Sequence, residues 1–136
     1  MEKKTSKNII ISGNLKSGMG KGKFFMGQDG YRKQFVKKLG IDSYRGTLNL
    51  KLNPTNSRKL AAIKRAKGIL VKGFKKGDKT FGEVLCYRAE ISGLDCALVI
   101  PKLSQHTNVA EMISSKKLRS ALNLKEGSLV KVTIKL

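Results

Sequence analysis

Apolar and polar residues alternate in two stretches of the chain, and both stretches predict β-strands with one buried face. In residues 46–52, three leucines alternate with Thr47, Asn49 and Lys51. In residues 129–136, an apolar side chain stands at every second position. Because successive side chains of a strand point to opposite faces, each stretch has one apolar face and one polar face.

Other segments predict further strands and a few short helices. Strands of the fully buried kind are expected at 8–15 and 96–100, and a hairpin is expected from 69–74 and 80–87 around a turn at 75–79. Helical spacing predicts a helix at 31–39 that ends at Gly40, and a second helix at 58–67 after a loop at 53–57. Further along, one or two helical turns are expected at 109–113. A last short helix is expected at 116–122, and Ser114 and Ser115 can cap it. The six or seven strands show no βαβ alternation, so we predict a mainly β fold, a small closed or nearly closed β-barrel.

The length and composition favour one compact domain. The chain has 136 residues, of which 40% are hydrophobic, and we expect a single domain over 1–136 with residues 1–7 as a flexible basic tail. No apolar run approaches the roughly 20 residues of a membrane-spanning helix, so we expect a soluble, cytoplasmic protein. Cys86 and Cys96 stand in apolar runs and are expected to be buried and inert, although a nucleophile pair with His106 stays formally open.

The charge of the chain indicates an anionic partner. The formal net charge is +20, from 29 Lys and Arg against 9 Asp and Glu. Nucleic acid, an acidic membrane surface or a phosphorylated small molecule would each be attracted by such a field. The shortage of carboxylates leaves few candidates for acid-base catalysis or metal binding.

Two segments carry candidate chemistry. The side-chain oxygens of Thr47 and Asn49, two residues apart on one strand face, can share a hard cation such as Mg²⁺ with substrate phosphates; the alternative is that they form only a solvated face. In residues 17–25, glycine alternates with other residues and lysines stand at Lys21 and Lys23. The pattern predicts either a glycine-rich flap over phosphates or a plain flexible hairpin.

Three groups of motifs together resemble one family, the archaeal CTP-dependent riboflavin kinases. They are Ser-Gly-Met-Gly-Lys-Gly-Lys-Phe-Phe at 17–25, Gly-Thr-Leu-Asn-Leu at 46–50, and Val-Ile-Pro-Lys at 99–102 followed by His106, Glu111, Lys-Leu-Arg at 117–119 and Leu-Lys-Glu-Gly at 124–127. The resemblance covers nearly the whole chain in the right order. It implies a six-stranded cradle-loop (RIFT-type) barrel and the transfer of the CTP γ-phosphate to the ribityl 5′-hydroxyl of riboflavin, which gives FMN and CDP.

The resemblance also implies roles for individual residues. It assigns CTP to Met19, Gly20, Lys21, Gly22, Lys23 and Phe24 and to Lys116, Lys117, Leu118 and Arg119, the flavin to Ser104 and Glu111, and Mg²⁺ to Thr47 and Asn49. Glu111 is the acidic candidate beside the flavin, as a base or as a residue that orients the substrate. A few basic side chains, backbone amides and one Mg²⁺ are sufficient for phosphoryl transfer, so the shortage of carboxylates agrees with this assignment.

A nucleic-acid-binding barrel without catalysis is the alternative. The basic stretches 32–38 and 58–67 could follow a phosphate backbone, but the aromatic residues are not interleaved with them as in a stacking platform. A related barrel that only senses flavin or nucleotide is a third hypothesis. For the kinase we expect a monomer that contacts CTP, CDP, riboflavin and FMN, and nucleic acid only through non-specific charge.

Overall fold

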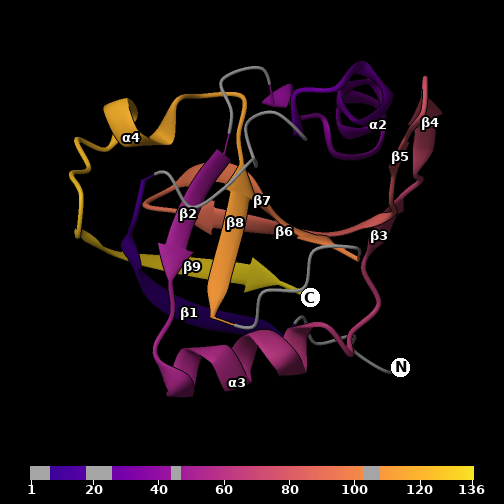
Figure 1. Ribbon diagram of the computed structural model, residues 1–136. Coiled ribbons are helices and arrows are strands. Elements are labelled where there is room, and N and C mark those ends of the chain that lie inside the picture. The colour runs from indigo at the N-terminus through magenta and orange to yellow at the C-terminus, as the bar shows by residue number, and fades with distance from the viewer. Residues whose placement is uncertain (1–6, 18–25, 44–46, 103–107) are drawn as a thin grey trace, which may run out of the picture.

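Six antiparallel strands form a closed barrel (Figure 1). The computed structural model describes residues 7–17, 26–43, 47–102 and 108–136. The barrel strands are β1 (Asn8–Leu15), β2 (Thr47–Lys51), β6 (Val84–Ile91), β7 (Leu94–Pro101), β8 (Val109–Ile113) and β9 (Leu129–Lys135). They pair in the order β6-β7-β8-β2-β1-β9, and a pairing of β9 with β6 closes the ring. The predicted closed six-stranded barrel is confirmed.

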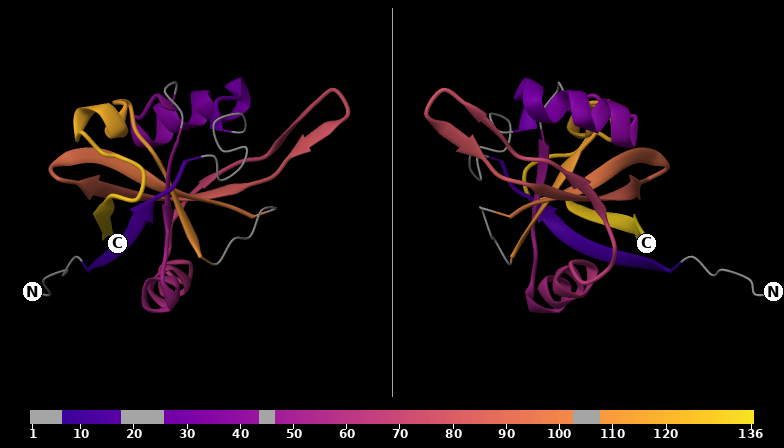
Figure 2. Two further views of the ribbon diagram at one scale, coloured as in Figure 1. Left: turned by 60° about the vertical axis from the view of Figure 1, so that its left-hand side comes forward. Right: turned by 90° about the vertical axis from the view of Figure 1, so that its right-hand side faces the viewer.

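A long hairpin extends from the barrel. Strand β3 (Ile69–Val71) pairs with β6, and the strands β4 (Phe74–Lys76) and β5 (Lys79–Phe81) pair with each other. The tip of this hairpin projects beyond the barrel (Figure 2). The hairpin predicted between 69–74 and 80–87 is therefore confirmed.

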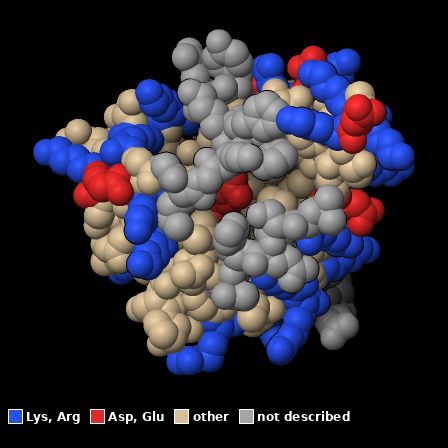
Figure 3. All heavy atoms as spheres, in the orientation of Figure 1, with Lys and Arg blue, Asp and Glu red and all other residues tan. Residues whose placement is uncertain are grey.

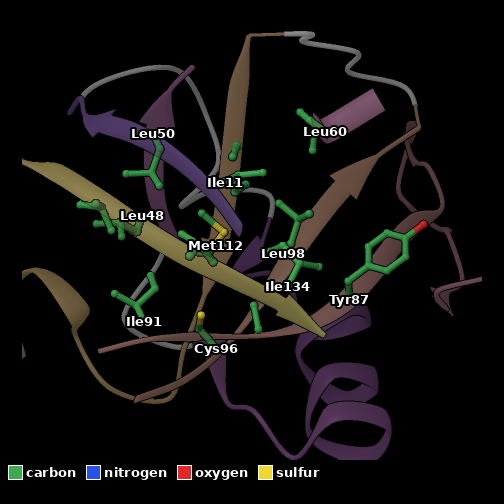
Figure 4. Close-up of a cluster of buried hydrophobic side chains, with 14 of the residues drawn as sticks. Ile11, Leu48, Leu50, Leu60, Tyr87, Ile91, Cys96, Leu98, Met112 and Ile134 are labelled. Carbon is green, nitrogen blue, oxygen red and sulfur yellow. The ribbon is translucent and has the colours of Figure 1, made fainter. Parts of the chain in front are cut away.

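The alternating strands place their apolar faces inside the barrel. Leu48 and Leu50 of β2 are buried and point toward Ile11, Leu98, Met112 and Ile134 from the other strands (Figure 4). Strand β1 was expected to be buried on both faces, and this is wrong, because Ile10 is 51% exposed. Since β1 lies on the surface of a barrel, only the side chains that point inward reach the core.

Three helices of the described residues lie at the two ends of the barrel. The helices α2 (Asp29–Leu39) and α4 (Leu118–Ala121) are at one end, and α3 (Pro54–Ile63) is at the other (Figures 1 and 2). Helix α2 ends at Gly40, whose φ of 71° is the left-handed conformation that glycine adopts without strain. Its buried Tyr31 and Phe35 belong to a second apolar cluster, together with Cys86 and Val99 of the barrel wall.

Helix α3 begins earlier than the sequence predicted. The expected loop at 53–57 is wrong, because Asn53 is the N-cap and Pro54 the first helical residue. The side chain of Asn53 accepts a hydrogen bond from the backbone N–H of Asn56 at 2.9 Å. An N-cap side chain satisfies an unpaired helical donor, and the fixed φ of proline suits the first turn. The same two residues that indicated a loop therefore start a helix.

The segment Val109–Ile113 is a strand, so the predicted helical turns are wrong. It pairs with β2 on one side and with β7 on the other. Its buried residues contribute to both apolar clusters, Met112 to the barrel interior and Ile113 to the cluster around α2. Five residues are too few for periodicity to distinguish a strand from a helix, and long-range pairing decides the outcome.

The predicted serine caps of the helix at 116–122 are also wrong. Helix α4 spans only Leu118–Ala121, and its N-cap is Lys117 without a side-chain hydrogen bond. Ser114 donates instead to the backbone oxygen of Asp95 at 3.0 Å, and Ser115 accepts from the backbone N–H of Asp42 at 2.9 Å. These serines therefore connect the segment to strand β7 and to the loop after α2.

Candidate functional site

Asn49 and Glu111 lie side by side on the outer face of the barrel. They are direct partners in the antiparallel pairing of β2 with β8, and Thr47 is the partner of Ile113 two residues along. Directly opposite residues of such a pair point to the same face of the sheet. Because Leu48 and Leu50 point into the barrel, Thr47, Asn49 and Glu111 share the outside. The structure therefore brings the two predicted metal ligands together with the predicted acidic residue.

One carboxyl oxygen of Glu111, Oε2, is buried and has no hydrogen-bond partner among the described residues. Burial raises the pKa of Glu111 from 4.5 to about 7, since the charged form loses hydration. A buried polar group without a partner is rare in proteins and is a candidate for contact with a ligand.

The end of strand β1 reaches the same region. The backbone N–H of Lys16 donates to the backbone oxygen of Asn49 at 3.1 Å. The next N–H, from Ser17, donates to both carboxylate oxygens of Glu126, at 3.0 and 3.2 Å. Arg119 donates to the hydroxyl of Ser17, and its second terminal nitrogen lies 3.8 Å from Oε1 of Glu126. The described start of motif 17–25 is thus held beside β2 and α4.

The segment 116–119 presents basic side chains at the surface. Lys116 and Lys117 are exposed, Arg119 is half-buried, and Leu118 is 4% exposed in the core. A ligand could therefore contact Leu118 only through its main chain. Lys and Arg side chains surround the face of the molecule shown in Figure 3, with few Asp and Glu between them. Such a surface attracts phosphorylated ligands.

Several predicted site residues lie outside the described residues. They are Met19, Gly20, Lys21, Gly22, Lys23, Phe24 and Ser104, together with Gly46 and His106. Their assignments stay predictions from the sequence.

The donor set on β2 fits a metal that is shared with a ligand. In the described ranges, no group of three or more His, Cys, Asp or Glu side chains could hold a metal ion. Thr47 and Asn49 offer two neutral oxygens on one strand face, and both residues are half-buried. Hard cations such as Mg²⁺ accept such oxygens and take their remaining ligands from water and phosphate.

The two cysteines do not contribute a nucleophile. Cys86 and Cys96 are free and buried, and burial raises the pKa of each thiol to about 12. A thiol with this pKa is almost fully protonated at neutral pH and is a poor nucleophile. The prediction of buried inert thiols is confirmed.

Two features of the site could not be found from the sequence. The pairing of Asn49 with Glu111 joins strands about sixty positions apart, so no local pattern reports it. The contact of Glu126 with Ser17 spans 109 positions. The Leu-Lys-Glu-Gly motif marks a turn in the sequence but does not indicate what the glutamate contacts.

A closed barrel that carries a buried carboxyl oxygen, neutral side-chain oxygens beside it and basic segments suits a protein that acts on a phosphorylated ligand. The family model named CTP-dep_RFKase, with the description "Domain of unknown function DUF120", matches residues 15–134. The chain belongs to this family, the riboflavin kinase family of the CTP-dependent type. A nucleic-acid-binding barrel without catalysis is not favoured by this match.

Curated archaeal relatives support the same family. The chain is 40% identical over 127 residues to a riboflavin kinase of Picrophilus torridus. The matched region covers 93% of this chain and 58% of the relative. It is 42% identical to a riboflavin kinase of Ignicoccus hospitalis, over 95% of this chain and 73% of the relative. It is also 42% identical to a riboflavin kinase of Archaeoglobus fulgidus, over 93% of this chain and 54% of the relative. The chain thus spans between about half and three quarters of the length of these relatives. No helix in the described part of the chain is long and apolar enough to cross a membrane.

Proposed function

We propose that this protein is a CTP-dependent riboflavin kinase. It transfers the γ-phosphate of CTP to the ribityl 5′-hydroxyl of riboflavin and releases FMN and CDP. Membership of the family and the names of the curated relatives support the reaction class. The proposal adds which atoms of this chain perform the reaction.

The observation that carries the proposal is the pairing of Asn49 with Glu111 on the outer face of the barrel. A neutral oxygen donor for a metal and a carboxyl group with a raised pKa are then adjacent, and this arrangement suits transfer from a metal-bound nucleotide to a hydroxyl group. In this arrangement the reacting hydroxyl lies beside the Glu111 carboxyl group, and the phosphates lie beside Asn49 on the same face of the barrel.

Thr47 and Asn49 hold Mg²⁺ in this proposal. Bound there, the ion would neutralise charge on the CTP phosphates. The two protein oxygens are neutral, so phosphate provides the negative ligands.

The basic segments bind the nucleotide. Lys116, Lys117 and Arg119 lie at or beside the start of α4 and offset phosphate charge. The main chain of Leu118 and the glycine-rich residues 19–24 complete the CTP site. Because the transition state of phosphoryl transfer spreads charge over the transferred group, positioned cations and amides stabilise it.

Glu111 and Ser104 bind the flavin, and Glu111 receives the proton of the reacting hydroxyl. The bond between the ribityl oxygen and the γ-phosphorus forms, the bond from that phosphorus to the bridging oxygen of CDP breaks, and the hydroxyl proton passes to the Glu111 carboxylate. A base works best when its pKa lies near the operating pH, and a pKa of about 7 meets this condition.

The test is FMN formation from riboflavin and Mg²⁺ with CTP, ATP, GTP or UTP supplied separately. FMN with CTP alone is the expected result. FMN with ATP in place of CTP would refute the nucleotide assignment but retain the kinase. No FMN with any of the four nucleotides would refute the proposed function.

A further inference from the structure

Glu126 links two segments that are far apart in the sequence and are both assigned to the nucleotide. Its carboxylate accepts the backbone N–H of Ser17 with both oxygens, at 3.0 and 3.2 Å. It also lies 3.8 Å from the guanidinium of Arg119, which donates to the hydroxyl of Ser17. Glu126 therefore holds the main chain of Ser17, and Arg119 holds its side chain.

The turn that carries Glu126 is itself fixed to strand β1. The N–H of Gly127 donates to the backbone oxygen of Leu15 at 2.7 Å, and the N–H of Leu15 donates to the backbone oxygen of Ser128 at 2.8 Å. The side chain of Asn14 donates to the backbone oxygen of Gly127 at 3.1 Å. Glu126 thus reaches Ser17 from a support that the barrel already orders.

The charge of Glu126 alone would oppose the binding of phosphates. A carboxylate beside Arg119 reduces the positive field that attracts an anion, and this chain has only 9 acidic residues. The contacts with Ser17 lower the pKa of Glu126, with Arg119 and Lys16 adding to the effect, so the side chain is ionised at neutral pH. A benefit to the nucleotide must then come from geometry.

We infer that Glu126 is a positioning residue for the nucleotide: it holds Ser17 and Arg119 in the arrangement that receives CTP. This inference rests on the proposed function, because that proposal assigns CTP to Arg119 and to the residues after Ser17. Hydrogen bonds from a backbone N–H to a carboxylate are stronger than neutral ones, so one side chain can fix both partners. Glu126 itself does not touch CTP.

The experiment measures the dissociation constant of CTP by calorimetry for the wild type, Glu126→Gln and Glu126→Ala. The matched control is Glu90→Ala, which removes an exposed carboxylate paired with Lys135 at 3.2 Å. Glu126→Ala weakens CTP binding about fivefold, the effect of losing one ordinary hydrogen bond, because solvent weakens the charge-assisted contact of this exposed side chain. Glu126→Gln keeps an acceptor oxygen and loses less affinity, and the control binds as the wild type does.

A purely electrostatic role gives the opposite sign. If Glu126→Ala and Glu126→Gln bind CTP as tightly as the wild type or more tightly, or if Glu90→Ala shows the same loss, the inference is wrong. A wild type that does not bind CTP also overturns it. If the wild type binds CTP and Glu126→Ala weakens binding but no FMN forms, this inference stands while the proposed function fails. Thermal unfolding of each variant verifies that the fold is retained.

A second readout is specific to positioning. In steady-state FMN formation, Glu126→Ala raises the KM for CTP about fivefold and leaves kcat and the KM for riboflavin within about twofold. An equal fall of kcat with an unchanged KM for CTP would contradict the role.

Discussion

The buried carboxyl group of Glu111 makes the stability of the protein depend on pH. Its pKa is raised from 4.5 to about 7 by burial, so the folded protein holds this proton more tightly than the unfolded chain. The stabilisation is complete below about pH 4.5 and is lost as the pH rises through about 7. A shift of this size corresponds to about 3 kcal/mol in the free energy of unfolding.

The substitution Glu111→Gln isolates this contribution. Glutamine has nearly the same shape but does not ionise, so its variant lacks the pH dependence that Glu111 adds. We expect the unfolding free energy of the wild type to fall by about 3 kcal/mol relative to Glu111→Gln between about pH 4 and pH 8. Taking the difference between the two proteins removes the titration of groups that they share.

The assay is urea unfolding followed by circular dichroism at several pH values. Glu90→Gln is the control, because its carboxylate lies at the surface in an ion pair with Lys135 and such pairs contribute little. A wild-type minus Glu111→Gln difference that stays constant from about pH 4 to pH 8 would refute the reasoning. Glu111 would then be hydrated or paired, and its assignment as a base near neutral pH would fail with it.

Two further predictions concern the metal ligands and the core. The double variant Thr47→Ala with Asn49→Ala lowers Mg²⁺-dependent FMN formation by at least about 100-fold, because the phosphates lose a positioned charge. Thr133→Ala on β9 is the matched control. Unchanged activity of the double variant would disprove the metal role. Leu50 has 0% exposure inside the barrel, so Leu50→Ala lowers the free energy of unfolding, measured by urea unfolding, by about 3 kcal/mol. The control is Leu129→Ala, at a site with 66% exposure. Equal losses of stability for the two variants would contradict the assigned core.

Two barrel strands could be predicted directly from the sequence because their apolar and polar residues alternate. The leucines of residues 46–52 and the apolar residues of 129–136 each have one inward face, and Gly40 ends α2 as expected. These signals are local, since side-chain direction in a strand and chain reversal at a glycine depend on neighbouring residues.

Non-local structure explains the predictions that were wrong. The segment Val109–Ile113 is a strand because β2 and β7 pair with it, and neither pairing is visible in its five residues. Asn53 and Pro54 suit both a loop and a helix start, and the packing of Leu60 and Ile63 into the barrel favours the helix.

The resemblance named the residues of the site but not their arrangement. It assigned Asn49 to the metal and Glu111 to the flavin, and only the strand pairing places them opposite each other. It included Glu126 in a motif without a role, and only the fold reveals its contact with Ser17.

The most direct measurement is the fate of a label on the γ-phosphate of CTP, followed in the presence of riboflavin and Mg²⁺. The account predicts that the wild type transfers the label to FMN and that Glu111→Gln transfers it much more slowly while still binding CTP. Label released only as inorganic phosphate, or label in FMN only when ATP replaces CTP, would contradict the assignment of this protein as a CTP-dependent riboflavin kinase.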